Sequence, residues 1–364
     1  MKKQAFIQEL KNALSQADPQ VREEIIADIS EHFTEGISQG LSEEEICRNL
    51  GQPGTIAAQV LEDYAVVQQK PPFQSTSQEQ TDDEPLAEGV NRLAGGGYEI
   101  DIDKTFVNVN SICAELSESN LRFVPAQGGS FRVTLKGRSR QNEFTIVELN
   151  GVLTVKAKSS AWKFSWFRFK SNLETTIYIP SQFMGDIRAK TSAGNISATD
   201  TSGQLDLKAS AGNITIGGHR ATKAHIRTSA GNANIQLASR LIEDLDVSSS
   251  AGNVELTAQE TGRVKLSTSA GNARANIARL GGDTSISSSA GSVDLTVREI
   301  AGDVKIKSSA GSVQVRMPAD ANCRIETKVP RYAGTVHNEI TGNPQSPYLL
   351  RATCSAGTVR LTAM

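Results

Sequence analysis

Ser192-Ala193-Gly194-Asn195 is the stretch that decides the fold, because close copies of it return through the C-terminal half of the chain. Ser-Ala-Gly followed by Asn or Ser begins at Ser192, Ser210, Ser229, Ser250, Ser269, Ser289 and Ser309, at steps of 18 to 21 residues. A degenerate copy begins at Tyr332 and a good one at Ser355. Returns at a period of about 20 residues are typical of a stacked repeat, in which each unit buries its apolar face only against its neighbours.

Apolar and polar residues alternate on both sides of each copy. Three residues before the serine, the chain carries Ala189, Leu207, Ile226, Val247, Leu266, Ile286, Ile306 and Ala352. Polar residues occupy the next position outward, four before the serine, and the same alternation continues after the turn. A period of two predicts two short strands in each unit, with one face inward and one face in water.

A second glycine recurs seven residues before the serine, at Gly185, Gly203, Gly262, Gly282 and Gly302, and predicts another corner. The sequence therefore predicts a mainly β chain: a single-stranded parallel β-solenoid of about nine coils of ~20 residues, with an N-terminal β cap and a small all-α bundle before it. In each turn, the glycine is expected to adopt a backbone angle closed to most residues. The alanine is expected to point its small side chain into a tight corner.

The residue after each Gly forms a row of its own. It is asparagine at Asn195, Asn213, Asn232, Asn253 and Asn272. Stacked asparagines can hydrogen-bond along the axis of a β-stack, so we expect a structural turn ladder. The alternative is a row of ligand-binding groups.

Four segments are predicted along the chain. Residues 1–69 combine amphipathic helical spacing with a capping box at Ser42 to Glu45, which is typical of a small all-α bundle. Residues 70–90 are acidic and contain prolines, so they are expected to form a flexible linker. Residues 91–186 should form the β cap with irregular first coils, and residues 187–364 the regular solenoid.

Charge is divided unevenly between these segments. Residues 1–70 carry a net charge of −6 and residues 71–90 one of −5, whereas residues 91–364 carry +9. A basic rod could favour anionic partners. Ordinary variation of surface charge explains the division equally well.

One segment concentrates aromatic and cationic side chains, namely Trp162, Phe164, Trp166, Phe167, Arg168, Phe169 and Lys170. Outward positions on the first regular coils add Arg188, Lys190, Lys208 and Arg227. Together these residues form a candidate interaction surface that suits an anionic surface, a glycan or a peptide groove. The alternative is that the aromatic residues close the end of the solenoid.

No pattern in the sequence indicates a catalytic residue, a cofactor or a metal. A phosphate-binding loop, a nucleophile elbow, a dinucleotide fingerprint and other direct nucleic-acid motifs are absent from the sequence. His219 is expected in an irregular turn and His225 in an outward row. Asp206 and Asp246 are expected on the same face two coils apart, which keeps a carbohydrate-active enzyme as an alternative. Cys354 falls in a row of small inward residues and is predicted to be a buried free thiol.

The sequence contains no apolar run long enough to span a membrane. The first ten residues also lack the continuous apolar core of a secretory signal. The expectation is therefore a cytoplasmic protein that can lie at the membrane surface.

Two resemblances cover nearly the whole chain. The run from Ser42 to Pro53, with the preceding run from Ile25 to Phe33, resembles the HAAS-type all-α signalling domain of Gram-positive bacteria. This resemblance implies a protein partner for the helices, such as a PadR-type transcription regulator. From about Phe106 to Leu361, the segment Ile177–Pro180 and the Ser-Ala-Gly-Asn copies resemble the "putative adhesin" β-solenoid family, a domain of unknown function found in envelope-stress gene neighbourhoods.

The leading hypothesis is a non-enzymatic scaffold or binding protein in envelope-stress signalling. Its helical head would contact a regulatory or membrane-associated partner, and its solenoid would present a binding face. The alternatives are a carbohydrate-active β-solenoid enzyme and a structural rod that assembles end to end. End-to-end assembly needs an open end, which the sequence places at residues 348–364.

Overall fold

The computed structural model divides the chain into two compact units, called here the head, up to Glu84, and the rod, from Pro85 onward. The residues that it describes are 2–15, 22, 23, 26, 29, 30, 33, 37, 42–55, 57, 88–92, 98–139, 143–158, 172–220, 222–237, 242–330, 332 and 334–364. Most of the predicted linker lies outside these residues.

The described head contains helices α1 (Lys3–Ala13) and α3 (Glu43–Leu50). The predicted capping box is confirmed: the Glu45 N–H donates to Ser42 Oγ at 3.3 Å, and the Ser42 N–H donates to Glu45 Oε2 at 2.9 Å. These bonds satisfy amide groups that the first turn of a helix otherwise leaves without partners. The Phe6 and Phe33 rings pack edge to face with centroids 5.8 Å apart, within a small core that includes Ile46.

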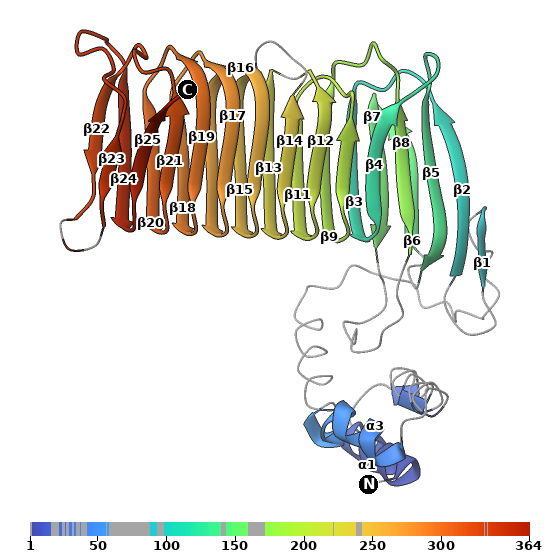
Figure 1. Cartoon of the computed structure of the whole chain (residues 1–364). Coiled ribbons are helices and arrows are strands. Elements are labelled where there is room, and N and C mark those ends of the chain that lie inside the picture. The colour runs from blue at the N-terminus through green and yellow to red at the C-terminus, as the bar shows by residue number, and fades with distance from the viewer. Residues whose placement is uncertain are drawn as a thin grey trace, which may run out of the picture. The chain divides into compact units, whose positions relative to one another are not determined.

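The strands of the rod lie side by side in one hydrogen-bonded sheet (Figure 1). This sheet has two layers, called here the first sheet and the second sheet, which the long strand β16 (Val254–Ala270) joins. The first sheet runs in the spatial order β6 (Glu143–Leu149), β7 (Val152–Lys158), β3 (Ser111–Glu118), β9 (Asp186–Ala193), β11 (Leu205–Ala211), β13 (Lys223–Ala230), β15 (Ile242–Ala251), the second half of β16 (Val254–Ala270), β18 (Thr284–Ala290), β20 (Val304–Ala310), β24 (Leu349–Ala356) and β22 (Arg324–Lys328).

The second sheet runs in the order β1 (Val90–Arg92), β2 (Tyr98–Phe106), β5 (Phe131–Ser139), β8 (Glu174–Ile179), β4 (Asn120–Pro125), β10 (Ile196–Thr199), β12 (Ile214–His219), β14 (Ala233–Leu237), the first half of β16, β17 (Ala273–Leu280), β19 (Val293–Ile300), β21 (Val313–Met317), β25 (Val359–Ala363) and β23 (Val336–Asn338). Strands β1, β2, β5 and β6 pair antiparallel, and the coils pair in parallel.

Parallel pairing in register confirms the predicted solenoid. Leu207 pairs with Ile226, and Ile226 with Val247, so each inward row is continuous from coil to coil. All three side chains are fully buried, as the alternation of apolar and polar residues predicts. Burial of such a side chain contributes about 1.5–3 kcal/mol, so the rows supply the main stabilisation of the rod.

The repeated turn packs each coil tightly on the one before. Gly252 has a φ of 149°, and a Cβ atom placed there would lie 2.1 Å from the carbonyl oxygen of Gly231. The prediction for the alanines was wrong, because Ala251 and its equivalents are exposed at the outside of the bend. A hydroxyl group occupies the inside of the corner instead: Ser249 Oγ donates to Gly231 O at 2.9 Å.

This hydroxyl recurs along the turn edge in the row of small residues that was predicted to point inward, but its hydrogen bond was not predicted. Thr228, Ser249, Thr268, Ser288 and Ser308 each donate to the turn glycine of the preceding coil at 2.8–2.9 Å. In the Ser355 coil, the Cys354 thiol donates to Gly311 O at 3.0 Å. Cys354 is a free and fully buried cysteine, as predicted, and burial raises the pKa of its thiol.

Both ends of the rod depart from the expected order, in which coils stack as they follow in sequence. Coil β24–β25, the last in sequence, lies between β20–β21 and β22–β23. At the other end, coil β3–β4 lies between the β7 and β8 strands and coil β9–β10. At the C-terminal end, the more apolar coil lies on the inside of the stack. Leu350, Val359 and Leu361 of coil β24–β25 are fully buried, whereas Val336 of the outer coil β22–β23 is 42% exposed.

Candidate functional site

Part of the predicted interaction surface lies on the outer face of the first sheet. Arg188, Lys190, Lys208 and Arg227 are exposed on β9, β11 and β13. Lys190 pairs in register with Lys208, and Lys208 with Arg227, so these three form one row, called here the cation row. The aromatic segment with Trp162, Phe164, Trp166, Phe167, Arg168, Phe169 and Lys170 lies outside the described residues, so its role as end plug or partner surface stays open.

Acidic neighbours neutralise this surface only in part. Lys208 Nζ lies 3.0 Å from Asp206 Oδ2, and the Arg188 guanidinium lies 3.5 Å from Asp186. Within the described parts of the chain, no carboxylate forms an ion pair with Lys190 or Arg227. Lys190 and Arg227, two coils apart, therefore have no ion-pair partner among the described residues; Glu115, in register with Lys190 on β3, pairs with Lys156 at 3.4 Å instead.

The acidic row considered for an enzyme is also in place. Asp206 pairs with His225, and His225 with Asp246, so the three residues occupy successive coils. Each carboxylate has a lysine beside it: Asp206 has Lys208 at 3.0 Å, and Asp246 has Lys265 at 3.7 Å. Both carboxylates therefore form ion pairs with lysines on the outer face of the first sheet.

His219 is placed differently from its prediction. It lies in β12, where a bulge between Gly217 and His219 shifts the register and turns the ring into the rod. The side chain is fully buried, and Nδ1 lies 2.8 Å from Thr201 Oγ1. Nε2 has no hydrogen-bond partner among the residues that the structure describes. Burial lowers the pKa of His219 to about 4, against a smaller opposing effect of the Thr201 and Gly203 backbone.

This burial predicts a stability that depends on pH. Between pH 6.5 and about 4 the unfolded chain binds a proton at His219 that the folded chain excludes, so the free energy of unfolding falls as the pH falls through this window. At about 1.4 kcal/mol per pH unit, the loss is on the order of 3 kcal/mol. Urea unfolding across the window should show this slope in the wild type and lose it in His219→Leu. His225→Gln, which changes an outward histidine, should keep the slope; an unchanged slope in His219→Leu would contradict the assignment.

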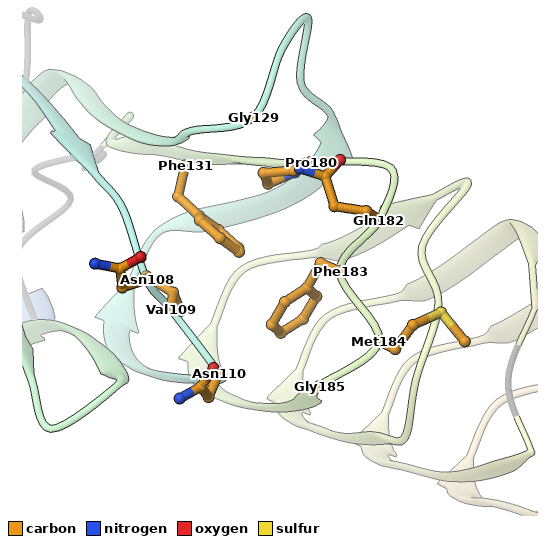
Figure 2. A pocket seen from close by; sticks show the side chains of 10 residues that line it. All are labelled: Asn108, Val109, Asn110, Gly129, Phe131, Pro180, Gln182, Phe183, Met184 and Gly185. Carbon is orange, nitrogen blue, oxygen red and sulfur yellow. The ribbon is translucent and has the colours of Figure 1, made fainter.

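A cavity of about 420 Å³ opens where three connections meet at the N-terminal end of the rod (Figure 2). The first connection joins β2 to β3 and carries Asn108 to Asn110, the second leads into Phe131 at the start of β5, and the third joins β8 to β9. No role could be predicted for these loops, because they show no repeat and no catalytic motif. The recurring Gly185 was the one available indication, and it was interpreted only as a corner.

Local geometry explains how the loops form this cavity. Asn108 has a left-handed φ of 59°, a conformation that asparagine tolerates better than most residues. A Cβ atom at Gly185 would lie 1.9 Å from Asn110 O, so only glycine lets the third connection pass the first. The rings of Phe131 and Phe183 pack edge to face with centroids 5.1 Å apart and form an apolar floor.

Within the described part of the chain, no group of three His, Cys, Asp or Glu side chains could hold a metal ion. No helix among the described residues is long and apolar enough to cross a membrane.

Comparison with solved structures finds similar proteins from several bacteria. A "putative adhesin" from Bacteroides fragilis is 14% identical, with a TM-score of 0.33 over 72% of this chain and 97% of that one. A "putative lipid binding protein" from Parabacteroides distasonis is 14% identical, with a TM-score of 0.36 over 72% and 97%. A "putative cell adhesion protein" from Clostridium sporogenes is 9% identical, with a TM-score of 0.23 over 72% and 100%.

Sequence comparison identifies the family directly. No curated protein matches the chain. The HAAS family profile matches residues 5–59, which contain most of α1 and all of α3. The Toastrack DUF4097 profile matches residues 109–341, most of the rod. The chain therefore belongs to the Toastrack DUF4097 family and carries a HAAS domain at its N-terminus.

Proposed function

We propose that this chain is a non-enzymatic binding protein in envelope-stress signalling. In this proposal, the rod presents the cation row to an anionic membrane surface. The HAAS head contacts a regulatory protein, with a PadR-type regulator as the first candidate. The protein would then act in the cytoplasm, at the inner face of the membrane.

The cation row is the observation that carries the proposal for the rod. Neighbouring strands lie about 4.8 Å apart, and like charges directly opposite each other destabilise a sheet. The fold does not require cations in this row, because the next three coils carry Ser248, Ser267 and Ser287 there. An anionic surface would attract Lys190, Lys208 and Arg227 and so offset the repulsion among them.

Removal of the two unpaired cations should weaken binding to anionic vesicles. Each Lys or Arg near such a surface contributes about 1 kcal/mol, so Lys190→Gln with Arg227→Gln should lower the affinity about thirtyfold. Co-sedimentation of the full chain with phosphatidylglycerol–phosphatidylcholine vesicles measures this change.

A control for this experiment lies in the same sheet. Lys305→Gln with Lys307→Gln removes the same charge from β20, six coils after β9 in sequence. We expect the control to bind like the wild type. Equal losses in both double variants would show that net charge, not the cation row, controls binding, and would overturn the proposed surface.

The head offers a separate site for a protein partner. A cavity of about 580 Å³ lies beside α1 and α3, with Phe6 and Cys47 at its base and Glu9, Glu44 and Arg48 at its rim. A cavity with Phe6 and Cys47 at its base and two carboxylates at its rim suits an amphipathic helix that carries both apolar and basic residues. The proposed HAAS contact therefore has a site of suitable chemistry within the head itself.

Charge reversal in the head should abolish this contact. With Glu9→Lys and Glu44→Lys, we expect titration calorimetry against a PadR-type regulator of the same genome to show at least a tenfold loss of affinity. Reversal of two exposed acids of the rod, Glu99→Lys with Asp320→Lys, should leave the affinity unchanged. Binding that survives the head variant would exclude this cavity as the contact.

A further inference from the structure

The cavity between the three loops has a lining without charge. None of its ten lining residues is Asp, Glu, Lys, Arg or His. Its floor is apolar, with Phe131, Phe183 and Pro180, and Met184 beside it is 68% exposed. Its volume of about 420 Å³ falls within the range of small-molecule sites, roughly 300–1,000 Å³.

Three carboxamides supply the polar groups of this cavity. Figure 2 shows Asn108 and Asn110 on one side of the two phenylalanine rings and Gln182 on the other. All three side chains are exposed, and no hydrogen bond joins them to another described residue. The Asn110 carboxamide lies against the β6–β7 turn, where a Cβ atom at Gly151 would be 2.6 Å from its Nδ2. Each carboxamide offers two N–H donors and one carbonyl acceptor. The rim can therefore form several neutral hydrogen bonds with one ligand.

This chemistry excludes several classes of ligand. A phosphate, a carboxylate or an ammonium group would lose its hydration without gaining an opposite charge. A bare acyl chain would strip water from the carboxamides and give them no partner. An extended peptide needs free backbone groups, yet the Phe183 N–H already donates to Pro180 O at 3.0 Å and the Asn110 N–H to Gly151 O at 2.7 Å.

We infer that this cavity is a binding site for a neutral saccharide of one or two rings. A pyranose ring has a face of C–H groups, which suits the floor of Phe131, Phe183 and Pro180. Its rim of hydroxyl groups, which both donate and accept, suits the carboxamides of Asn108, Asn110 and Gln182. The inference is independent of the cation row and of the head.

Saturation-transfer NMR on the full chain tests the inference with a defined panel of neutral sugars: glucose, galactose, N-acetylglucosamine and their disaccharides. We expect saturation transfer to at least one sugar, with affinity in the millimolar range, measured by titration. Asn108→Gly should weaken that affinity about tenfold through loss of one amide contact. Glycine accepts the left-handed φ of 59° at this position, so the variant should fold normally. Gln182→Ala should give a similar loss from the opposite side.

Asn150→Gly is the matched control. Asn150 also has a left-handed φ, of 53°, but it does not line the cavity, so its replacement should leave sugar binding unchanged. Three results would overturn the inference: no transfer to any neutral sugar, equal affinity in Asn108→Gly and the wild type, or binding of decanoate or a peptide that depends on Asn108. Loss of vesicle binding in the cation-row variant leaves this test unaffected.

Discussion

Gly252→Ala should unfold part of the rod, although it adds a single methyl group. The new Cβ would lie 2.1 Å from the Gly231 carbonyl oxygen, and that oxygen belongs to the backbone of the preceding coil. The φ of 149° is also unfavourable for a residue with a side chain. Backbone strain and overpacking together should cost about 3–5 kcal/mol. The lost stability can be measured as a shift of the urea midpoint for the full chain.

Gly217→Ala provides a control in β12, one strand of the same repeat. A Cβ atom there would meet nothing within 4 Å, and φ lies outside the left-handed region. Because glycine weakens a strand relative to alanine, this variant should be neutral or slightly more stable than the wild type. If Gly252→Ala and Gly217→Ala unfolded at the same urea concentration, the turns could not be packed as closely as the structure has them.

The regular coils could be predicted from the sequence because the same short pattern of apolar residues and a turn recurs in each coil. Leu207, Ile226 and Val247 each occupy the same position before the turn, and register then follows from the burial of one face. The capping box at Ser42 was equally local. Ser249 belongs to the row of small residues that was predicted to point inward, but its bond to Gly231 O could not be predicted because it joins two coils.

The candidate sites depended on contacts that no local pattern encodes. The outward positions of Lys190 and Lys208 follow from the alternation of apolar and polar residues, so the cation row could be predicted from the sequence. His219 was assigned to a turn because Gly217-Gly218 was taken as the end of the strand, whereas it marks a bulge that shifts the register. The cavity joins Asn108, Phe131 and Gln182, which lie on three separate loops and meet only through the tertiary fold.

The stacking order of the end coils could not be predicted from the sequence either. Coil β3–β4 was not recognised because its turn reads Ser117-Glu118-Ser119-Asn120, without the glycine of the repeat. Its Asn120 nevertheless belongs to the asparagine row: Asn120 Oδ1 accepts from the Asn195 N–H at 3.0 Å. Asn195, Asn213, Asn232 and Asn253 each accept in the same way from the next coil at 2.8–2.9 Å, and Asn272 from Ser292. Polar contacts thus extend the stack beyond the glycine pattern.

The insertion of coil β24–β25 predicts that a short truncation harms the rod more than a long one. Deletion of residues 349–364 removes five fully buried side chains, Leu350, Ala352, Cys354, Val359 and Leu361, whose burial contributes roughly 5–10 kcal/mol. It also leaves β22 and β23 without the strands they pair with, because β22 pairs with β24 and β23 with β25. The segment 318–348 would then hang from the last intact coil with Cys323 and Ile340 uncovered.

Deletion of residues 318–364 removes that segment as well and ends the rod at β21, where the inward row of Val313, Val315 and Met317 still packs on the coil before it. We therefore expect the long truncation to be monomeric and resistant to trypsin, and the short one to aggregate and to be cut within 318–348. Under stacking in chain order, the short truncation would only trim the terminal coil and would be the milder change. Protection of residues 324–338 from trypsin in the short truncation would mean that the outer coil can stack directly on β20 and β21. The inserted order would then have no energetic consequence, because the rod would tolerate either arrangement.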